Sequence, residues 1–579
     1  MKRNINKVAI IGSGIMGSSI ACHFANIGVN VLLLDIVPTK LSNEEIEKEI
    51  NENDKIFRNK IVSSSLNKTI KSKPSPLYNK KFRERIVIGN LEDDIEKVET
   101  ADWIIEVVIE KIEIKNTVFE KLDKYRKKGS LISSNTSGIP INSMIKNRSE
   151  DFCDNFCGTH FFNPPRYLKL LEIIPSEKTK PEVIDFLINY GEKFLGKTTI
   201  SCKDTPAFIA NRIGIANIAS LFKIVNEMKL TVEETDFLTG PIIGIPKSAT
   251  FRTCDLVGLD TVKHVANGIY ENCPNDEIHK DFKLTEFVQS MIKKNLLGNK
   301  TGEGFYKKTK NQSGNKEILT LDLNTLEFRK KIKPKFNSIK NVKKETNLHK
   351  RIPLLINGNE KENIFYKKMF GSLFSYAANK IPEISNEIYK IDKAIVNGFG
   401  WEIGPYEIWD SIGFQNGLEL IKNNKLTTPE WINKIDSKNN NFSFYKVLDG
   451  IQHYYDIKTE KYNKIPGITN FIFLNNIRNQ QTIWKNNGVN LIDIGDGILN
   501  LEFQTKMNSI GEDVINGITE SISIAEKNYK IQLFDINGKL LYENIGNSLD
   551  ISKFDNALYI VKLFDLISNR SIDLKVIKN

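Results

Sequence analysis

A glycine-rich segment near the start of the chain restricts the fold more than any other feature of the sequence. The segment 12–17, GSGIMG, directly follows a continuous apolar run at residues 7–11. Such a run is typical of a buried parallel strand, and residues 18–28 then have the pattern of a helix that ends at a glycine. A second apolar run follows and ends at Asp35. The order of strand, glycine turn, helix and strand predicts the first half of a doubly wound α/β domain.

The same segment predicts a dinucleotide-binding site. Gly12 permits a tight turn, Gly14 lets the main chain approach a pyrophosphate, and Gly17 allows the helix to pack closely on the strand. Asp35 is placed to accept hydrogen bonds from a ribose, and its charge would repel a 2′-phosphate, so we expect NAD rather than NADP. The residues of the turn expected to bind the cofactor are Gly12, Gly14, Ile15, Met16 and Gly17.

Apolar runs and helical patterns continue to alternate up to about residue 200. Strands are expected at 85–89, 101–108 and 130–137, with a helix from about 112 to 127. This alternation predicts a parallel sheet with helices on both faces. Between residues 38 and 80 the chain is charged and helical, and it is either a solvated helical hairpin or a flap over an elongated ligand.

Bulk composition excludes several classes of protein. The chain has 579 residues, which is too long for one core, and its 40% hydrophobic and 26% charged residues are usual for globular proteins. The net charge is +11, but the lysines are scattered, so we expect no nucleic-acid partner. Six irregularly spaced cysteines predict reduced thiols and no metal site. Neither a signal peptide nor a membrane span is expected, which favours the cytoplasm.

Four motifs in a fixed order then connect the chain to a known family. They are SNTS at 134–137, HFFNP at 160–164, the glutamate Glu172 in an apolar run, and KDTPAFIANR at 203–212. In this order, behind a dinucleotide-binding pattern, they resemble the 3-hydroxyacyl-CoA dehydrogenases of fatty acid β-oxidation over at least residues 5–310. The resemblance continues into the long bacterial form, in which a second helical copy and an enoyl-CoA hydratase domain follow the dehydrogenase.

His160 and Glu172 are the candidates for proton transfer. Oxidation of a secondary alcohol needs a base for the hydroxyl proton, and a neutral imidazole is suited to that task near neutral pH. A carboxylate bonded to the other ring nitrogen fixes the tautomer and stabilises the imidazolium. The alternative interpretation is a core histidine beside an unrelated carboxylate.

The resemblance implies roles for five further residues. Ser137 and Asn211 would hydrogen-bond the oxygen atoms of the substrate, with Ser137 also beside the cofactor, and Asn163 would help to position the catalytic loop. Glu110 and Lys115 would contact the cofactor, although a surface ion pair at a helix start is the alternative.

Two positions depart from the pattern of the family. Gly138 stands where a second small polar residue is common after SNTS, and Ala207 replaces a glycine. Both changes affect the expected tightness of loops more than the chemistry.

The rest of the chain divides by its patterns. Residues 360–415 repeat the order of glycines, proline and aspartates found at 236–260, which predicts a second helical copy without a catalytic histidine. The repeated residues are Asp392, Gly398, Gly400, Gly404, Pro405 and Asp410. Residues 489–528 resemble the start of an enoyl-CoA hydratase domain that is too short to form its oxyanion site. Alternating apolar residues and an Asn-Gly turn at 537–538 then predict a small antiparallel sheet, which resembles a type IX secretion sorting tail.

These patterns predict an α/β protein with an N-terminal doubly wound domain, two mostly helical domains and a small β-rich tail. The expected boundaries are an NAD-binding domain at 1–203, a helical substrate or dimerisation domain at 204–310, a linker at 311–350, a second helical domain at 351–488, a truncated hydratase-like start at 489–528, and a β-rich tail at 529–579.

The function that the resemblance implies is NAD-dependent oxidation of (3S)-3-hydroxyacyl-CoA to 3-oxoacyl-CoA. The expected partner is an acyl-CoA substrate, and the duplicated helical domain predicts a homodimer or a pseudo-dimer. Two alternatives stay open. One is an NAD-dependent dehydrogenase of a short hydroxy acid without CoA, and the other is a surface or binding protein with a vestigial dehydrogenase part.

Overall fold

The computed structural model describes residues 3–577, apart from 312, 439–441, 468–470, 528, 547–548, 556 and 566–570. Parts of the expected β-rich tail therefore lie outside the described residues. The chain forms two compact units, one of Met1–Tyr445 with Tyr455–Lys461 and the other of Lys446–Tyr454 with Tyr462–Asn579.

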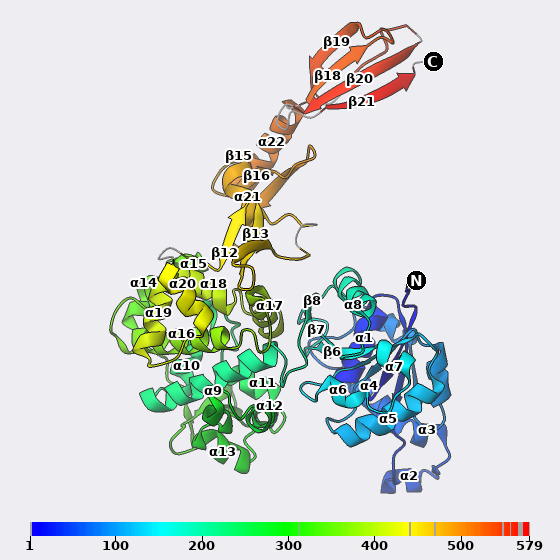
Figure 1. The fold of residues 1–579 in the computed structure, drawn as a ribbon, viewed down its shortest axis with the longest axis vertical. Helices are drawn as coiled ribbons and strands as arrows, with labels where there is room; N and C mark the ends of the chain where they lie inside the picture. Colours follow the sequence, from blue (N-terminus) through cyan, green and yellow to red (C-terminus); the bar gives the residue numbers. More distant parts are fainter. Residues whose placement is uncertain are drawn as a thin grey trace. The chain divides into compact units, whose positions relative to one another are not determined.

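The first unit begins with an eight-stranded sheet in the order β3-β2-β1-β4-β5-β6-β7-β8. Neighbouring strands are parallel, except that β6 and β7 are antiparallel. The strands are β1 (Lys7–Ile11), β2 (Asn30–Asp35), β3 (Ile86–Asn90), β4 (Trp103–Glu106), β5 (Leu131–Ser134), β6 (Phe156–Phe161), β7 (Leu170–Pro175) and β8 (Thr198–Ser201). The predicted doubly wound sheet is confirmed, and it forms the blue and cyan part of Figure 1.

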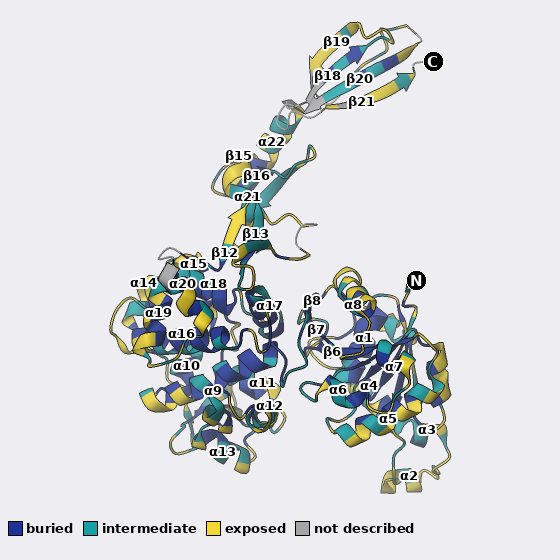
Figure 2. Ribbon diagram, in the orientation of Figure 1, coloured by how far each residue is buried: buried dark blue, intermediate teal, exposed yellow. Residues whose placement is uncertain are grey.

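Helices and short 3₁₀ segments connect these strands. They are α1 (Ile15–Asn26), α2 (Asn43–Glu47), α3 (Lys55–Arg58), α4 (Lys60–Ile70), η1 (Lys80–Arg85), η2 (Ile95–Thr100), α5 (Ile112–Tyr125), α6 (Ile141–Met144), α7 (Glu150–Asp154) and α8 (Pro181–Lys193). In the charged segment 38–80, α2 has no buried residue, whereas α4 contacts α1 and buries Val62 and Leu66. The segment is therefore anchored on the domain at one end and exposed at the other (Figure 2).

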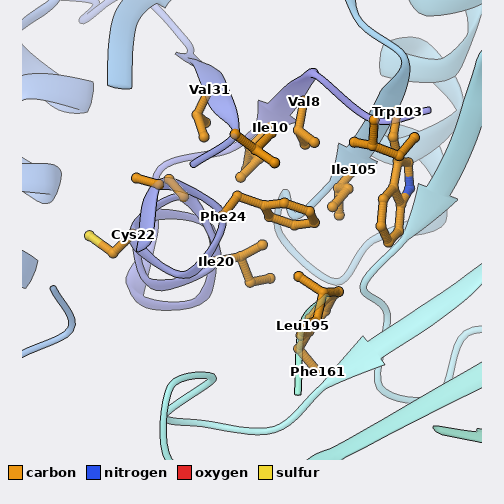
Figure 3. Packing of buried hydrophobic residues seen from close by; sticks show 14 of the residues in the cluster. Val8, Ile10, Ile20, Cys22, Phe24, Val31, Trp103, Ile105, Phe161 and Leu195 are labelled. Atoms are coloured by element: carbon orange, nitrogen blue, oxygen red, sulfur yellow. The ribbon is translucent and has the colours of Figure 1, made fainter. Parts of the chain in front are cut away.

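The core of this domain fills the space between α1 and the sheet. Phe24 of α1 packs edge-on against Trp103 of β4, with ring centroids 5.4 Å apart. Figure 3 shows these two rings among Val8, Ile10 and Ile105. Strands β1 and β4 contribute continuous apolar runs because both of their faces are covered. This core fixes the carboxyl ends of β1, β5 and β6, where the candidate residues lie.

Two sets of helices follow. The first contains α9 (Ala210–Met228), α10 (Val232–Leu238), η3 (Pro241–Ile243), α11 (Phe251–Val257), α12 (Leu259–Asn272), η4 (His279–Lys283) and α13 (Glu286–Lys293). The second contains α16 (Lys361–Asn379), α17 (Ile388–Phe399), α18 (Pro405–Ile412), α19 (Phe414–Asn423) and α20 (Glu430–Lys438). They are green and yellow-green in Figure 1. Most residues of α9 and α16 are buried, and so is one face of α17 (Figure 2).

Two aspartates close the first helical copy. Asp236 accepts main-chain hydrogen bonds at the start of α11, including one of 2.7 Å from Phe251, and a 2.8 Å bond from the hydroxyl of Tyr306. Asp255 accepts the main-chain N–H groups of Phe305 and Tyr306 at 2.8 and 3.0 Å. Phe305 and Tyr306, at the end of the copy, thus bind Asp236 and Asp255 in its middle, and we call this arrangement a latch.

The second copy contains the same latch. Asp392 accepts a 2.9 Å bond from the main-chain N–H of Tyr406 and a 2.8 Å bond from the hydroxyl of Tyr445. Asp410 accepts the N–H groups of Phe444 and Tyr445 at 2.7 and 2.9 Å. The predicted internal repeat is therefore present in the hydrogen bonding as well as in the sequence.

Residues 311–350 differ from the expected linker. They contain most of a three-stranded sheet, α14 and the start of α15. In α14, Ile339 and Val342 are buried, and just before it the ring centroid of Phe336 lies 5.8 Å from that of Phe237. Abundant lysine and asparagine dominate the composition of this segment, but Phe336, Ile339 and Val342 recur every three residues and so lie on one face of a short helix. The elements are β9 (Tyr306–Lys310), β10 (Lys316–Leu321), β11 (Phe328–Lys330), α14 (Asn337–Val342) and α15 (Leu348–Leu355).

The remaining elements belong mostly to the second unit. They are β12 (Tyr445–Leu448), β13 (Ile451–Asp456), β14 (Lys461–Lys464), α21 (Leu474–Gln481), β15 (Thr482–Lys485), β16 (Val489–Asp493), β17 (Leu499–Phe503), η5 (Lys506–Asn508), α22 (Glu512–Lys527), β18 (Tyr529–Phe534), β19 (Leu540–Ile545), β20 (Leu558–Asp565) and β21 (Ser571–Ile577). The last four strands form an antiparallel sheet in the order β19-β18-β20-β21, as predicted, with a turn at Asn537-Gly538. Among the described helices, none has the length and apolar character needed to cross a membrane.

Candidate active site

His160 and Glu172 lie directly opposite each other on the antiparallel strands β6 and β7. Nδ1 of His160 is 2.7 Å from Oε2 of Glu172, and the two residues expose 5% and 0% of their surface. Because the side chains of paired residues project from the same face of a sheet, the register alone brings the imidazole to the carboxylate. The two side chains are therefore in direct contact.

The second oxygen of Glu172 is also occupied. Oε1 accepts the main-chain N–H groups of Ile209 and Ala210 at 3.1 and 2.9 Å. These two residues form the start of α9, the long helix that opens the first helical copy. The start of a helix interacts favourably with an acceptor oxygen, so these two N–H groups hold the side chain of Glu172 in place.

Aromatic rings surround the imidazole. The ring of His160 lies 4.5 Å from that of Phe162 and 5.7 Å from that of Phe208. The amide side chain of Asn135 accepts the N–H of Phe161 at 2.9 Å and thereby ties β6 to the end of β5. With Nδ1 engaged by Glu172, Nε2 is the ring nitrogen that can exchange a proton with a ligand.

The glycine turn between β1 and α1 has the geometry of a phosphate cradle. A Cβ on Gly12 would lie 2.6 Å from the carbonyl oxygen of Val107, and one on Gly17 would lie 1.9 Å from that of Gly12. A Cβ on Gly14 would meet nothing within 4 Å, so this face is open for a ligand. Gly14 caps α1 without a side-chain bond, and Ile15 is exposed. These residues fit a dinucleotide pyrophosphate.

Asp35 stands at the carboxyl end of β2, as the sequence predicts. Its Oδ2 accepts hydrogen bonds from the N–H and hydroxyl of Ser13 at 2.6 and 2.5 Å, and its Oδ1 accepts the N–H of Ile36 at 2.7 Å. These bonds hold the carboxylate next to the glycine turn, which is the position required to receive a ribose.

Glu110, Lys115 and Ser137 form one cluster. Oε1 of Glu110 accepts the N–H of Ser137 at 2.8 Å and the hydroxyl of Thr136 at 2.5 Å. Nζ of Lys115 is 3.3 Å from Oε2 of Glu110. Burial would raise the pKa of Glu110, but Lys115 and these hydrogen bonds lower it. Lys115 exposes only 1% of its surface, so the alternative of a surface ion pair is wrong.

Glu106 belongs to this cluster and was missed by the sequence reasoning. It ends β4 fully buried and binds Nζ of Lys115 at 2.8 Å and the hydroxyl of Ser134 at 2.5 Å. Burial raises the pKa of Glu106, although Lys115 opposes the shift. A carboxylate at the end of an otherwise apolar strand was the signal that could have found it.

Two predicted residues lie on segments that flank the histidine. Asn163 is the second residue of the loop that follows β6, and Asn211 is the second residue of α9, beside the amides that bind Glu172. The ammonium of Lys197 is buried against the carbonyl oxygens of Pro165 and Leu168 and so holds the loop that carries Asn163. The structure thus brings both asparagines to elements in contact with the His–Glu pair.

The two departures from the family pattern face each other. A Cβ on Gly138 would lie 3.5 Å from the main-chain nitrogen of Ala207. Ala207 and Phe208 both adopt left-handed backbone angles, with φ of 63° and 50°. This distance is an ordinary van der Waals contact, so a small side chain would fit at 138, whereas at 207 an alanine takes a conformation that favours glycine.

A nicotinamide-dependent dehydrogenase is the class of enzyme that this fold and this site define. The sequence profile of the 3-hydroxyacyl-CoA dehydrogenase NAD binding domain matches residues 7–205, and that of the 3-hydroxyacyl-CoA dehydrogenase C-terminal domain matches residues 208–308. A probable 3-hydroxyacyl-CoA dehydrogenase of Bacillus subtilis is 41% identical over 540 residues, which are 93% of this chain and 67% of the relative. The chain belongs to the 3-hydroxyacyl-CoA dehydrogenase family and is an NAD-dependent enzyme.

Two further comparisons agree with this assignment. The human mitochondrial hydroxyacyl-coenzyme A dehydrogenase is 30% identical over 307 residues, or 52% of this chain and 91% of the relative. The crystal structure of a 3-hydroxybutyryl-CoA dehydrogenase from Escherichia coli superposes with a TM-score of 0.53 at 20% identity, over 74% of this chain and 98% of that one. The second similarity establishes a shared fold.

Proposed function

We propose that this enzyme oxidises (3S)-3-hydroxyacyl-CoA thioesters to 3-oxoacyl-CoA with NAD, as a step of fatty acid β-oxidation. The observation that carries the proposal is the buried 2.7 Å contact between Nδ1 of His160 and Glu172. Membership of the family supports the CoA thioester as the substrate class.

In this mechanism the side chain of His160 is the general base. Glu172 accepts a hydrogen bond from Nδ1–H, which leaves the lone pair on Nε2 free to take the proton of the 3-hydroxyl group. The carboxylate then stabilises the imidazolium that forms. When bound, NAD supplies the acceptor for the hydride that leaves C3 of the substrate. The phenyl rings of Phe162 and Phe208 keep water away from the imidazole.

The other predicted residues orient the reactants. Ser137 and Asn211 would hydrogen-bond the oxygen atoms of the substrate near C3, and Asn163 would shape the loop after His160. Glu110 holds the main chain at Ser137 through a 2.8 Å bond. The position of Ser137 therefore depends on an ionised Glu110.

The cofactor site uses the first βαβ unit. Gly12, Gly14 and Gly17, with the main chain of Ile15 and Met16, would hold the pyrophosphate at the start of α1. Asp35 would receive the adenosine ribose, and Glu110 and Lys115 would lie toward the nicotinamide end.

Replacement of the base tests the mechanism. We predict that His160→Gln lowers kcat on the order of 10²-fold or more, because glutamine cannot accept the proton, while the Kd for NAD changes little. The matched control is His264→Gln, at an exposed position of α12. Steady-state NAD reduction and fluorescence titration with NADH measure the two effects. Turnover within a few-fold of the parent would exclude His160 as the base.

A substrate series tests the thioester. We expect oxidation of 3-hydroxyacyl-CoA esters, competitive inhibition by free CoA, and little turnover of the corresponding free 3-hydroxy acids. Equal rates on the free acids, with no inhibition by CoA, would instead support a dehydrogenase of short hydroxy acids.

Location and assembly are part of the same proposal. We propose a cytoplasmic enzyme in which the duplicated helical domain forms a pseudo-dimer within one chain. Fractionation of cells and light scattering of the purified protein test these two points, and a stable two-chain assembly would contradict the second.

A further inference from the structure

The position of Glu172 depends on the start of α9. One oxygen of Glu172 faces His160, and the other accepts the N–H groups of Ile209 and Ala210. The turn just before these residues contains the left-handed Ala207 and Phe208. A strained turn keeps its shape only when the surroundings fix it, so the groups that hold this turn also hold the carboxylate.

Arg212 directly follows Asn211 in α9 and is fully buried. Its Nε donates to the hydroxyl of Tyr376 at 2.7 Å, and its Nη2 donates to Asp276 at 2.6 Å and to Glu383 at 2.7 Å. Its main-chain N–H also donates to the carbonyl oxygen of Ala207 at 3.2 Å. Arg212 therefore links the strained turn to two helical copies at once, because Asp276 belongs to the first copy and Tyr376 and Glu383 to the second.

The acceptors around Arg212 are themselves connected. The hydroxyl of Tyr376 donates to Asp276 at 3.0 Å, and Nζ of Lys380 contacts Asp276 at 3.0 Å and Glu383 at 2.8 Å. Because Arg212, Asp276 and Lys380 are buried and mutually paired, removal of one partner leaves the others desolvated without compensation. Arg212, Asp276, Tyr376, Lys380 and Glu383 thus form one connected set, called here the arginine cluster.

A second contact from the second copy reaches β7, β8 and Phe162, the residue that follows β6. A Cβ on Gly398, near the end of α17, would lie 2.8 Å from Cδ2 of Leu170 and 3.3 Å from the ring of Phe162. The side chain of Asn397 accepts a 3.1 Å bond from the hydroxyl of Thr198 on β8. Phe162 is one of the two rings that lie beside His160. Helix α17 thus packs against Phe162, which lies beside His160. The arginine cluster instead contacts the turn whose amides bind Glu172.

We propose that the second helical copy positions the His160–Glu172 pair, with Arg212 as its main connection to Glu172. The inference rests on the proposed role of this pair in catalysis. Arg212 touches neither substrate nor cofactor in this role. It acts through the main chain of residues 207–210, so it is a positioning residue, and so are Tyr376 and Glu383.

Tyr376→Phe tests the connection. The substitution removes one hydroxyl from the arginine cluster and keeps the ring. We expect kcat to fall roughly tenfold, because small misplacements of a catalytic group are costly, with KM for NAD and for the thioester within about twofold of the parent. The matched control is Tyr366→Phe on the same helix, whose buried hydroxyl donates to the carbonyl oxygen of Leu238 at 2.9 Å. The control should lower the thermal midpoint but leave kcat within about twofold.

Glu383 provides a second test that does not depend on a buried site, since 43% of its side chain is exposed. Glu383→Ala should lower kcat several-fold, and Glu383→Gln, which keeps an acceptor for Arg212, should restore most of the turnover. If Tyr376→Phe does not fold, this pair decides the matter. An unchanged kcat in a folded Tyr376→Phe or in Glu383→Ala overturns the inference, and so does an equal loss in Tyr366→Phe.

The same assays separate this inference from the proposed mechanism. If His160→Gln abolishes turnover and Tyr376→Phe does not change it, only the positioning role is lost. If His160→Gln retains turnover, the proposed mechanism is wrong whatever the tyrosine variants show.

Discussion

Three buried cations hold the segments around the His–Glu pair, and each meets acceptors of a different kind. Lys115 lies between carboxylates, and Arg212 binds carboxylates and a phenol. Lys197 exposes only 6% of its surface and donates to the main-chain carbonyl oxygens of Pro165 and Leu168. Carbonyl oxygens carry no net charge, and burial therefore lowers the pKa of Lys197 to about 8.

This lowered pKa predicts a pH dependence of stability. Between pH 8 and 10.5 the unfolded chain holds the Lys197 proton more tightly than the folded chain, so the group makes folding more favourable as the pH rises through this window. Lys197→Met lacks this titration. The free energy of unfolding of the parent should therefore increase relative to that of the variant, by about 3 kcal/mol at most, from pH 8 to 10.5. Urea unfolding of both proteins measures the difference, and a constant difference would contradict the shifted pKa.

At the scale of elements, one antiparallel pair inside a parallel sheet creates the candidate site. Strands β6 and β7 pair antiparallel, and their register places His160 opposite Glu172. Successive side chains of a strand point to opposite faces, so a slip by one residue would move the carboxylate away from the imidazole. The close contacts of β6 with β5, and of α9 with the end of Glu172, prevent such a slip.

The junction of β1 and α1 yields a prediction for two glycines. Gly17→Ala should lower both the thermal midpoint and the affinity for NAD, because its methyl group would overlap the carbonyl oxygen of Gly12. Gly14→Ala should weaken NAD binding alone, since its methyl group meets no protein atom and occupies the space expected for phosphate. Thermal unfolding and NADH titration separate the two effects. A loss of stability in Gly14→Ala equal to that in Gly17→Ala would contradict this assignment of roles.

The elements also show which features a sequence can predict. Local periodicity predicted the sheet, the long helices and the β-rich tail, because each pattern lies within a short segment. The side-chain partners of Arg212 in the arginine cluster could not be predicted, since they lie 64 to 171 positions away and only packing brings them together. In 311–350, abundant lysine and asparagine hid the few apolar residues that anchor α14. The catalytic and cofactor roles remain predictions from the family resemblance.

At the scale of the whole molecule, the chain combines a first unit that contains the candidate active site with a second unit that has a hydrophobic core of its own. The sheet β18–β21 belongs to the second compact unit and buries Ile531, Leu533, Tyr559 and Val561 in a cluster of its own. Every residue proposed to act in the reaction belongs to the first unit.

Removal of residues 529–579 should therefore leave the enzyme intact. We expect NAD reduction by the shortened chain to stay within about twofold of the parent and the thermal midpoint of the first unit to change little, because an independent domain stabilises mainly itself. Limited proteolysis followed by assay of the N-terminal fragment is an independent check. A fragment without activity would mean that the tail completes the fold of the enzyme.

The latches of the two helical copies have a consequence for synthesis on the ribosome. Each copy closes only when its last tyrosine, Tyr306 or Tyr445, reaches its aspartate. Since domains tend to fold in order from the N-terminus, the first copy can close before the second has left the exit tunnel. Until Tyr376 and Glu383 emerge, Asp276 is the one carboxylate of the arginine cluster that Arg212 can bind. A nascent chain that ends between 310 and 370 would hold the histidine and the glutamate yet lack the support proposed for their alignment, and the enzyme would become active late in its own translation.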